Sequence, residues 1–224
     1  MQSKNRFITI ASIAGLMAFV GDFLVTFVLG FFYPDYNHFT LVMSELGTSQ
    51  SPVAIWTNLW WIVFGALFIV FAAGLRTTFA SEKKSITLVA LLIALFGLGA
   101  GIGAGLFPME PGGAETTLAG KLHGIFAGLG FIAISFVPLV SMAIFSRSQD
   151  PGMFWLSAGV FILGLASFAL FVASEDAVSG AGLMSYAGLW QRLFLLNHYG
   201  YLAVISARMI QSSRCSASDW KRKG

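Results

Sequence analysis

The stretch ITLVALLIALFGLGAGIGAGLF, residues 86–107, decides the fold class, because its 22 residues include no charged side chain. A helix of that length rises about 33 Å, enough to cross a hydrocarbon core of about 30 Å. Inside a bilayer the backbone N–H and C=O groups find no water, so an open chain crosses as helices. The stretch therefore predicts a transmembrane helix.

Five more apolar stretches of similar length flank it. The chain has 224 residues, of which 57% are hydrophobic and 10% charged, whereas soluble domains carry about 25% charged residues. The mean hydropathy is +0.80. We predict an all-α membrane bundle that forms one domain over residues 1–224. Its six transmembrane helices are expected at about 7–32, 53–75, 86–107, 122–145, 153–173 and 189–210.

The basic residues predict the orientation of the bundle. Eleven of the 13 Lys and Arg residues fall on one side of the predicted membrane, and only Lys121 and Arg192 fall on the other. Cytoplasmic loops carry the excess of Lys and Arg, so both termini are expected in the cytoplasm. The net charge of +3 then follows from topology, and no nucleic acid is expected as a partner.

Glycines recur at every fourth position of the third and fourth predicted spans. The rows are Gly97, Gly101 and Gly105; Gly99 and Gly103; and Gly120, Gly124 and Gly128. Small residues at this spacing let membrane helices approach closely, so these two helices are expected to pack tightly. The dinucleotide fingerprint G-x-G-x-x-G after a strand is not met, and no cofactor is expected.

Asp22 and His198 lie deep inside predicted spans, about 14–15 Å from the outer boundary. An unpaired charge at that depth is costly, so such residues face the bundle interior and find partners. We predict that the first and sixth helices are neighbours and that Asp22 lies near His198. Two interpretations stay open: a hydrogen-bonded pair that fixes helix register, or a functional proton or ligand site.

A second polar group is expected at the outer boundary. Pro108 ends the third span and the Pro-Gly-Gly at 111–113 turns the chain back, which brings Glu110 towards His123. Ser44 and Glu45 belong to a neighbouring outer loop. Glu110 and His123 are candidates for an acid–base pair or for a simple loop-stabilising hydrogen bond.

Arg192 is predicted about 5 Å inside the outer boundary. One interpretation is a solvated residue at a helix end. The other is a cation held among Glu45, Glu110, Glu175 or Asp176 that binds a phosphate or carboxylate headgroup.

These residues define the candidate sites. The candidate ligand-binding residues are Ser44, Glu45, Glu110, His123 and Arg192. Ser44, Glu110 and His123 are also candidate catalytic residues, because a serine is activated as a nucleophile by a histidine base. No metal site is expected, since the three histidines are far apart in sequence and no H-E-x-x-H motif occurs.

Several short motifs carry a family resemblance. YPDY at 33–36, SELG at 44–47, FPME at 107–110, His123 and GLWQR at 188–192 together resemble the uncharacterised six-pass membrane family called domain of unknown function 998. Members of that family commonly have Asp where this chain has Glu110. The resemblance implies a bacterial or archaeal plasma membrane. The family is similar in layout to a eukaryotic six-pass group that includes a lipid-remodelling factor for glycosylphosphatidylinositol anchors, which implies lipid chemistry or lipid handling.

Three functions are consistent with this sequence. The leading hypothesis is a protein that binds or senses a lipid headgroup or small amphiphile in an outward-facing polar pocket, with membrane lipids as partners. The second is a membrane-embedded lipid-modifying enzyme, either a hydrolase or an acyl transferase. The third is a structural or partner-binding membrane subunit whose polar residues only lock helices together.

Overall fold

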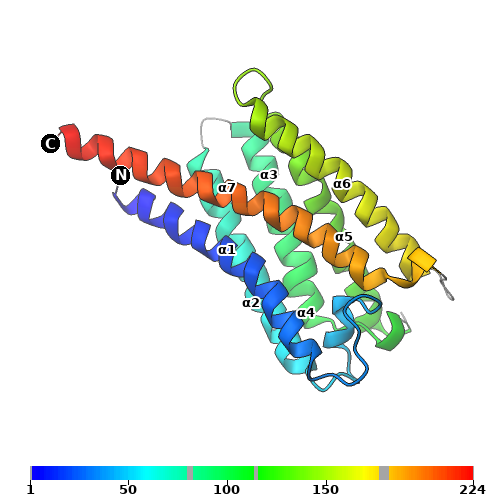
Figure 1. Ribbon diagram of the computed structural model, residues 1–224. Helices are drawn as coiled ribbons and strands as arrows, with labels where there is room; N and C mark the ends of the chain where they lie inside the picture. The colour runs from blue at the N-terminus through cyan, green and yellow to red at the C-terminus, as the bar shows by residue number, and fades with distance from the viewer. Residues whose placement is uncertain (1, 80–82, 114–115, 177–181, 224) are drawn as a thin grey trace.

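The computed structural model (Figure 1) describes residues 2–79, 83–113, 116–176 and 182–223. Every regular element in these ranges is helical. Six helical segments are long and apolar enough to cross a membrane, which confirms the predicted all-α membrane bundle.

The third span differs from the other five in having a break in its α-helical pattern. The unbroken helices are α1 (Gln2–Gly30), α2 (Ala54–Thr78), α5 (Leu118–Ser141), α6 (Pro151–Asp176) and α7 (Ala187–Lys223). The third span consists of α3 (Lys83–Phe96), the π-helical segment η2 (Gly97–Gly103) and α4 (Ala104–Leu106). The short 3-10 helices are η1 (Met43–Gly47), η3 (Pro111–Gly113) and η4 (Gly182–Ser185).

Each predicted span falls on one of these segments, with shifted ends. The fourth span was expected at 122–145, whereas α5 covers Leu118–Ser141. Thr117 caps its start, because the Thr117 hydroxyl oxygen accepts the Gly120 N–H at 3.1 Å. The helix ends three residues after Pro138, which has no N–H to donate to the helical ladder.

The helices form a closed ring in the order α1, α2, α3, α5, α6, α7 and back to α1. Figure 1 shows α1 and α7 side by side, as the sequence predicted. Both ends of the chain and the α5–α6 connection lie at one end of the bundle, called the terminal end below. The opposite end carries η1 and η3 and is called the loop end.

The two glycine rows of the third span face different neighbours. A Cβ at Gly101 would lie 2.6 Å from the Gly65 Cα on α2, and a Cβ at Gly99 would lie 2.3 Å from the Phe126 carbonyl oxygen on α5. The expected tight contact between the third and fourth spans is therefore present. Not every glycine of the predicted row on α5 takes part in this contact. Gly128 has no neighbour within 4 Å of its Cβ position.

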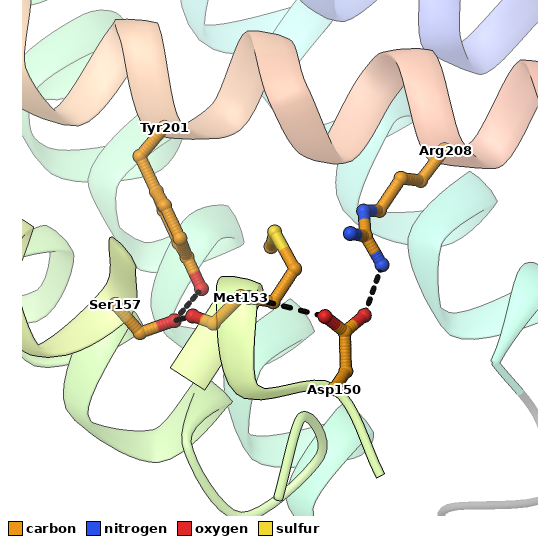
Figure 2. A network of polar contacts seen from close by, with 5 residues as sticks. All are labelled: Asp150, Met153, Ser157, Tyr201 and Arg208. Carbon is orange, nitrogen blue, oxygen red and sulfur yellow. Dashed lines mark hydrogen bonds and ion pairs between the residues drawn. The ribbon is translucent and has the colours of Figure 1, made fainter. Parts of the chain in front are cut away.

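A polar network fixes α6 to α7 at the terminal end (Figure 2). Arg208 on α7 forms an ion pair with Asp150, which directly precedes α6. The other carboxylate oxygen of Asp150 accepts the Met153 N–H at 3.1 Å. The Met153 hydrogen bond and then Arg208 lower the pKa of Asp150. Further into the bundle, the Tyr201 and Ser157 hydroxyls share a hydrogen bond of 2.7 Å.

Candidate functional site

A small cavity lies inside the ring, between η1 and the middle of α1. Its volume is about 30 Å³, room for one or two water-sized groups. Five of the six spans contribute to its wall, and α6 does not. Its polar lining consists of Asp22, Ser44, Gln191 and Tyr199.

Asp22 is the only acidic residue in the cavity lining, and it is 3% exposed. One carboxylate oxygen accepts the Trp60 indole N–H at 3.2 Å, and the other accepts the Tyr199 hydroxyl at 3.0 Å. Both donors are neutral. Within the described ranges, no Lys, Arg or His side chain forms an ion pair with Asp22. A carboxylate has about four lone-pair sites, so these two bonds leave it acceptor capacity.

Aromatic rings form the next part of the wall. Trp61, Phe64, Phe96 and Phe131 line the cavity together with Tyr199. The Tyr199 ring centroid lies 6.2 Å from that of Phe64 and 6.3 Å from that of Phe96. The cavity therefore combines one buried carboxylate with several aromatic rings.

The SELG motif forms most of η1, which contributes Met43 and Ser44 to the loop-end side of the cavity. Two side chains hold this short helix in place. Gln191 accepts the Met43 N–H at 2.6 Å through its side-chain oxygen, and Asn58 donates to the Gly47 carbonyl at 3.0 Å. A side chain at Gly47 would collide with Asn58, because a Cβ there would lie 2.5 Å from the Asn58 amide oxygen.

Arg192 binds the segment that connects α1 to η1. Its guanidinium donates to the carbonyls of His38 at 2.6 Å, Leu41 at 3.1 Å and Gly188 at 3.0 Å. It also donates to the Tyr36 hydroxyl at 2.7 Å. In this structure Arg192 therefore positions the loop above the cavity and does not line the cavity itself.

The pKa values of two neighbours of Arg192 are shifted. Burial raises the pKa of Tyr36. Burial and the positive charge of Arg192 lower the pKa of His38. A neutral His38 can accept through Nδ1, which lies 3.3 Å from an Arg192 nitrogen.

The two candidate carboxylates of the loop end make separate contacts. Glu45 in η1 accepts the Gly112 N–H at 2.9 Å, and burial raises its pKa against the opposing effect of that bond. Glu110 accepts the Thr116 hydroxyl and the Thr117 N–H, both at 2.6 Å. These bonds lower the pKa of Glu110 to about 2. The described bonds of Arg192 include neither carboxylate, and the Asp176 side chain lies outside the described residues.

The candidate catalytic residues Ser44 and His123 lie in different surroundings. Ser44 lies on the cavity wall. His123 is buried near the start of α5, and its Nδ1 lies 2.8 Å from the Phe107 carbonyl oxygen. His123 links α5 to the end of the third span.

His198 and Asp22 belong to different contacts, although α1 and α7 are neighbours as predicted. The Nδ1 of His198 lies 2.8 Å from the Phe194 carbonyl oxygen of its own helix. Its Nε2 is buried and makes no hydrogen bond to a described residue. A Cβ at Gly164 on α6 would lie 3.0 Å from that nitrogen. The α7 partner of Asp22 is Tyr199, the residue after His198.

Sequence reasoning missed Tyr199, Trp60 and Gln191. A spacing signal was present, because Gln191, Leu195 and Tyr199 follow one another at intervals of four and so share one face of a helix. All three line the cavity. The sequence interpretation favoured His198 because it is ionisable and as deep as Asp22, but adjacent residues point about 100° apart around a helix. Among the described residues, no three His, Cys, Asp or Glu side chains are placed to hold a metal ion.

Comparison with known proteins gives one family match. A family model described as "Protein of unknown function (DUF998)" matches residues 13–208. Neither the curated proteins nor the solved structures contain a match. The matched range includes all the cavity-lining residues.

Proposed function

The chain belongs to the DUF998 family, and from this premise we propose that it binds a lipid headgroup or a small amphiphile in the cavity between η1 and Asp22. One observation carries the proposal: a buried carboxylate lines an internal cavity of a membrane bundle. Ionisable residues inside membrane spans commonly mark ligand or ion sites, because their burial is costly. A role limited to helix packing would not require a cavity beside the carboxylate.

The direction of access follows from the charge pattern. The positive-inside rule assigns the terminal end to the cytoplasm, so the loop end faces outwards. A ligand would then enter past η1, whose position depends on the side chains of Gln191 and Asn58. The cavity is small as it stands, well below the 300–1,000 Å³ typical of ligand pockets. It therefore fits the reactive tip of a headgroup, and a larger ligand requires η1 to move outwards.

Native mass spectrometry of the gently purified full-length protein tests this proposal. We expect the wild-type protein to retain lipid or amphiphile, and the cavity-filling substitution Ala127→Val to lose most of it. Ala127 lines the cavity. The matched control is Ala166→Val, because Ala166 is exposed on α6, which contributes nothing to the cavity.

Retention by the wild type and Ala166→Val but not by Ala127→Val supports the proposal. Equal retention by all three proteins would move the binding site elsewhere and contradict it. A wild-type protein that retains no lipid or amphiphile contradicts it as well.

A further inference from the structure

We propose that the cavity recognises a primary ammonium group, with Asp22 as its counter-ion. The ligand class is then a primary amine, either free or as the headgroup of an amino-lipid. This inference rests on the proposed function and names the chemistry that the same cavity selects.

The charges around the cavity favour a cation. Two of the lining residues can carry a negative charge: Asp22 and the much weaker acid Tyr199. None of the lining residues is basic. Asp22's hydrogen-bond donors Trp60 and Tyr199 are neutral. The guanidinium of Arg192 makes its described hydrogen bonds to the α1–η1 segment and to Gly188. The positive charge of Arg192 acts on Asp22 through space, without a direct ion pair between these two described side chains. A buried carboxylate without an ion-pair partner is costly, and a bound cation offsets that cost.

The chemistry of the wall favours an organic ammonium over a bare metal ion. Phe64, Phe96 and Tyr199 present aromatic rings to the same cavity as Asp22, and aromatic faces attract ammonium groups through their quadrupoles. An –NH₃⁺ group has three N–H donors. The carboxylate of Asp22 and the hydroxyl of Ser44 are acceptors on the cavity wall. The wall therefore offers both polar and aromatic contacts to such a group.

The size of the cavity selects the type of ammonium. The cavity has room for one or two water-sized groups. A primary ammonium is of similar size, whereas a trimethylammonium adds three methyl groups. The wall therefore distinguishes an ethanolamine-type headgroup from a choline-type headgroup.

Lipid competition on the full-length protein tests the proposal. The protein is reconstituted with equal amounts of phosphatidylethanolamine and phosphatidylcholine of the same acyl chains, and the retained lipids are counted by native mass spectrometry. We expect the wild type to retain phosphatidylethanolamine at least about tenfold over phosphatidylcholine, and Asp22→Asn to lose this preference. The matched control is Ser135→Ala, because Ser135 is buried on α5 and its hydrogen bond among the described residues is to the Phe131 carbonyl of its own helix, at 2.8 Å.

A second measurement separates a free amine from a lipid headgroup. Thermal unfolding of the delipidated protein is followed in ethanolamine hydrochloride, tetramethylammonium chloride and sodium chloride at equal concentration. Stabilisation by ethanolamine alone supports the ammonium site, and it assigns a soluble amine as the ligand if phosphatidylethanolamine shows no preference. This wild-type measurement does not depend on the folding of any variant.

The failures of the two proposals are distinguishable. Equal retention of both phospholipids, together with no specific effect of ethanolamine, overturns the ammonium site and leaves the binding of lipid intact. Stabilisation by sodium equal to that by ethanolamine also overturns it. If no lipid and no amine binds, both proposals fail.

Discussion

The hydroxyl of Tyr199 on α7 donates a hydrogen bond to the carboxylate of Asp22 on α1, with 3.0 Å between the two oxygens. The indole of Trp60 on α2 donates to the other carboxylate oxygen at 3.2 Å. One buried carboxylate thus connects three helices that are consecutive in the ring. The same bonds orient Asp22 at the wall of the internal cavity.

Replacing Tyr199 with Phe removes the hydroxyl and keeps the ring. Because the Asp22 oxygen then loses a buried donor, the free energy of unfolding is expected to fall by about 1–3 kcal/mol. Unfolding of the purified protein in mixed detergent micelles measures this change. Tyr186→Phe is the matched control, since Tyr186 is 40% exposed and surface substitutions change stability by about 0.5 kcal/mol or less. Equal losses in the two variants would refute a special role for the Asp22–Tyr199 bond.

Gly99→Ala tests the close contact between the third span and α5. The new Cβ would lie 2.3 Å from the Phe126 carbonyl oxygen, so the backbones must separate. We expect a loss of about 1–3 kcal/mol in unfolding free energy, as for other overpacked sites. Gly128→Ala on α5 meets nothing within 4 Å and should be neutral or stabilising by up to about 1 kcal/mol. Thermal unfolding of both variants gives the comparison, and a tolerated Gly99→Ala would contradict the described packing.

Arg192→Lys keeps the charge but loses the fork of donors that reaches His38, Leu41 and Tyr36. A lysine cannot make these bonds together. Local opening of residues 36–42 is then expected to become easier by about 1.5–3 kcal/mol, the usual range for hydrogen bonds to a charged group. Hydrogen exchange of that segment measures the change. The control Arg147→Lys, at the terminal end, should leave hydrogen exchange of residues 36–42 unaltered. If both variants change the exchange of this segment equally, the proposed role of Arg192 is contradicted.

Glu110 makes loop stability sensitive to acid. Its hydrogen bonds to Thr116 and Thr117 lower its pKa from 4.5 to about 2. The ionised form is thus favoured by the folded loop, so its contribution is complete above about pH 4.5 and is lost as the pH falls towards 2. We therefore measure the free energy of unfolding of Glu110→Gln from pH 6 to pH 2. Its decrease in acid should be smaller than that of the wild type, because the contribution of Glu110 is absent. Asp35→Asn controls for removal of one loop-end carboxylate, and an unaltered profile in Glu110→Gln would refute the assignment.

The contribution of Glu45 to stability changes with pH in the opposite direction. Burial in η1 raises its pKa above 4.5, so the folded state favours the protonated form. Its contribution is complete below pH 4.5 and is lost as the pH rises through the raised pKa. Glu45→Gln removes this loss of stability. The protection factors of the η1 amides, which are exchange rates corrected for the intrinsic effect of pH, should then vary less between pH 4.5 and 7. If the protection factors of Glu45→Gln vary with pH as much as those of the wild type, another group causes the variation.

The six helices could be predicted from the sequence because each span is a local property. A stretch such as residues 86–107 is long and apolar enough to cross a bilayer, and no distant residue alters that requirement. The glycine spacing likewise predicted a tight contact between the third span and α5, which the close approach of Gly99 to Phe126 confirms. The depth of Asp22 predicted that α1 faces the bundle interior, and its neighbour α7 was predicted correctly.

Only the tertiary structure decided which side chains meet. Tyr199 and His198 are adjacent and equally deep, yet about 100° of helix rotation separates their directions, and the rotation of α7 is set by packing against α1 and α6. Arg192 contacts Leu41 across 151 positions of sequence, a pairing that no local pattern encodes. The sequence alone therefore determined how many times the chain crosses the membrane, because hydropathy acts along the chain. The folded bundle determined the cavity and its carboxylate, because contacts between helices depend on how the helices rotate.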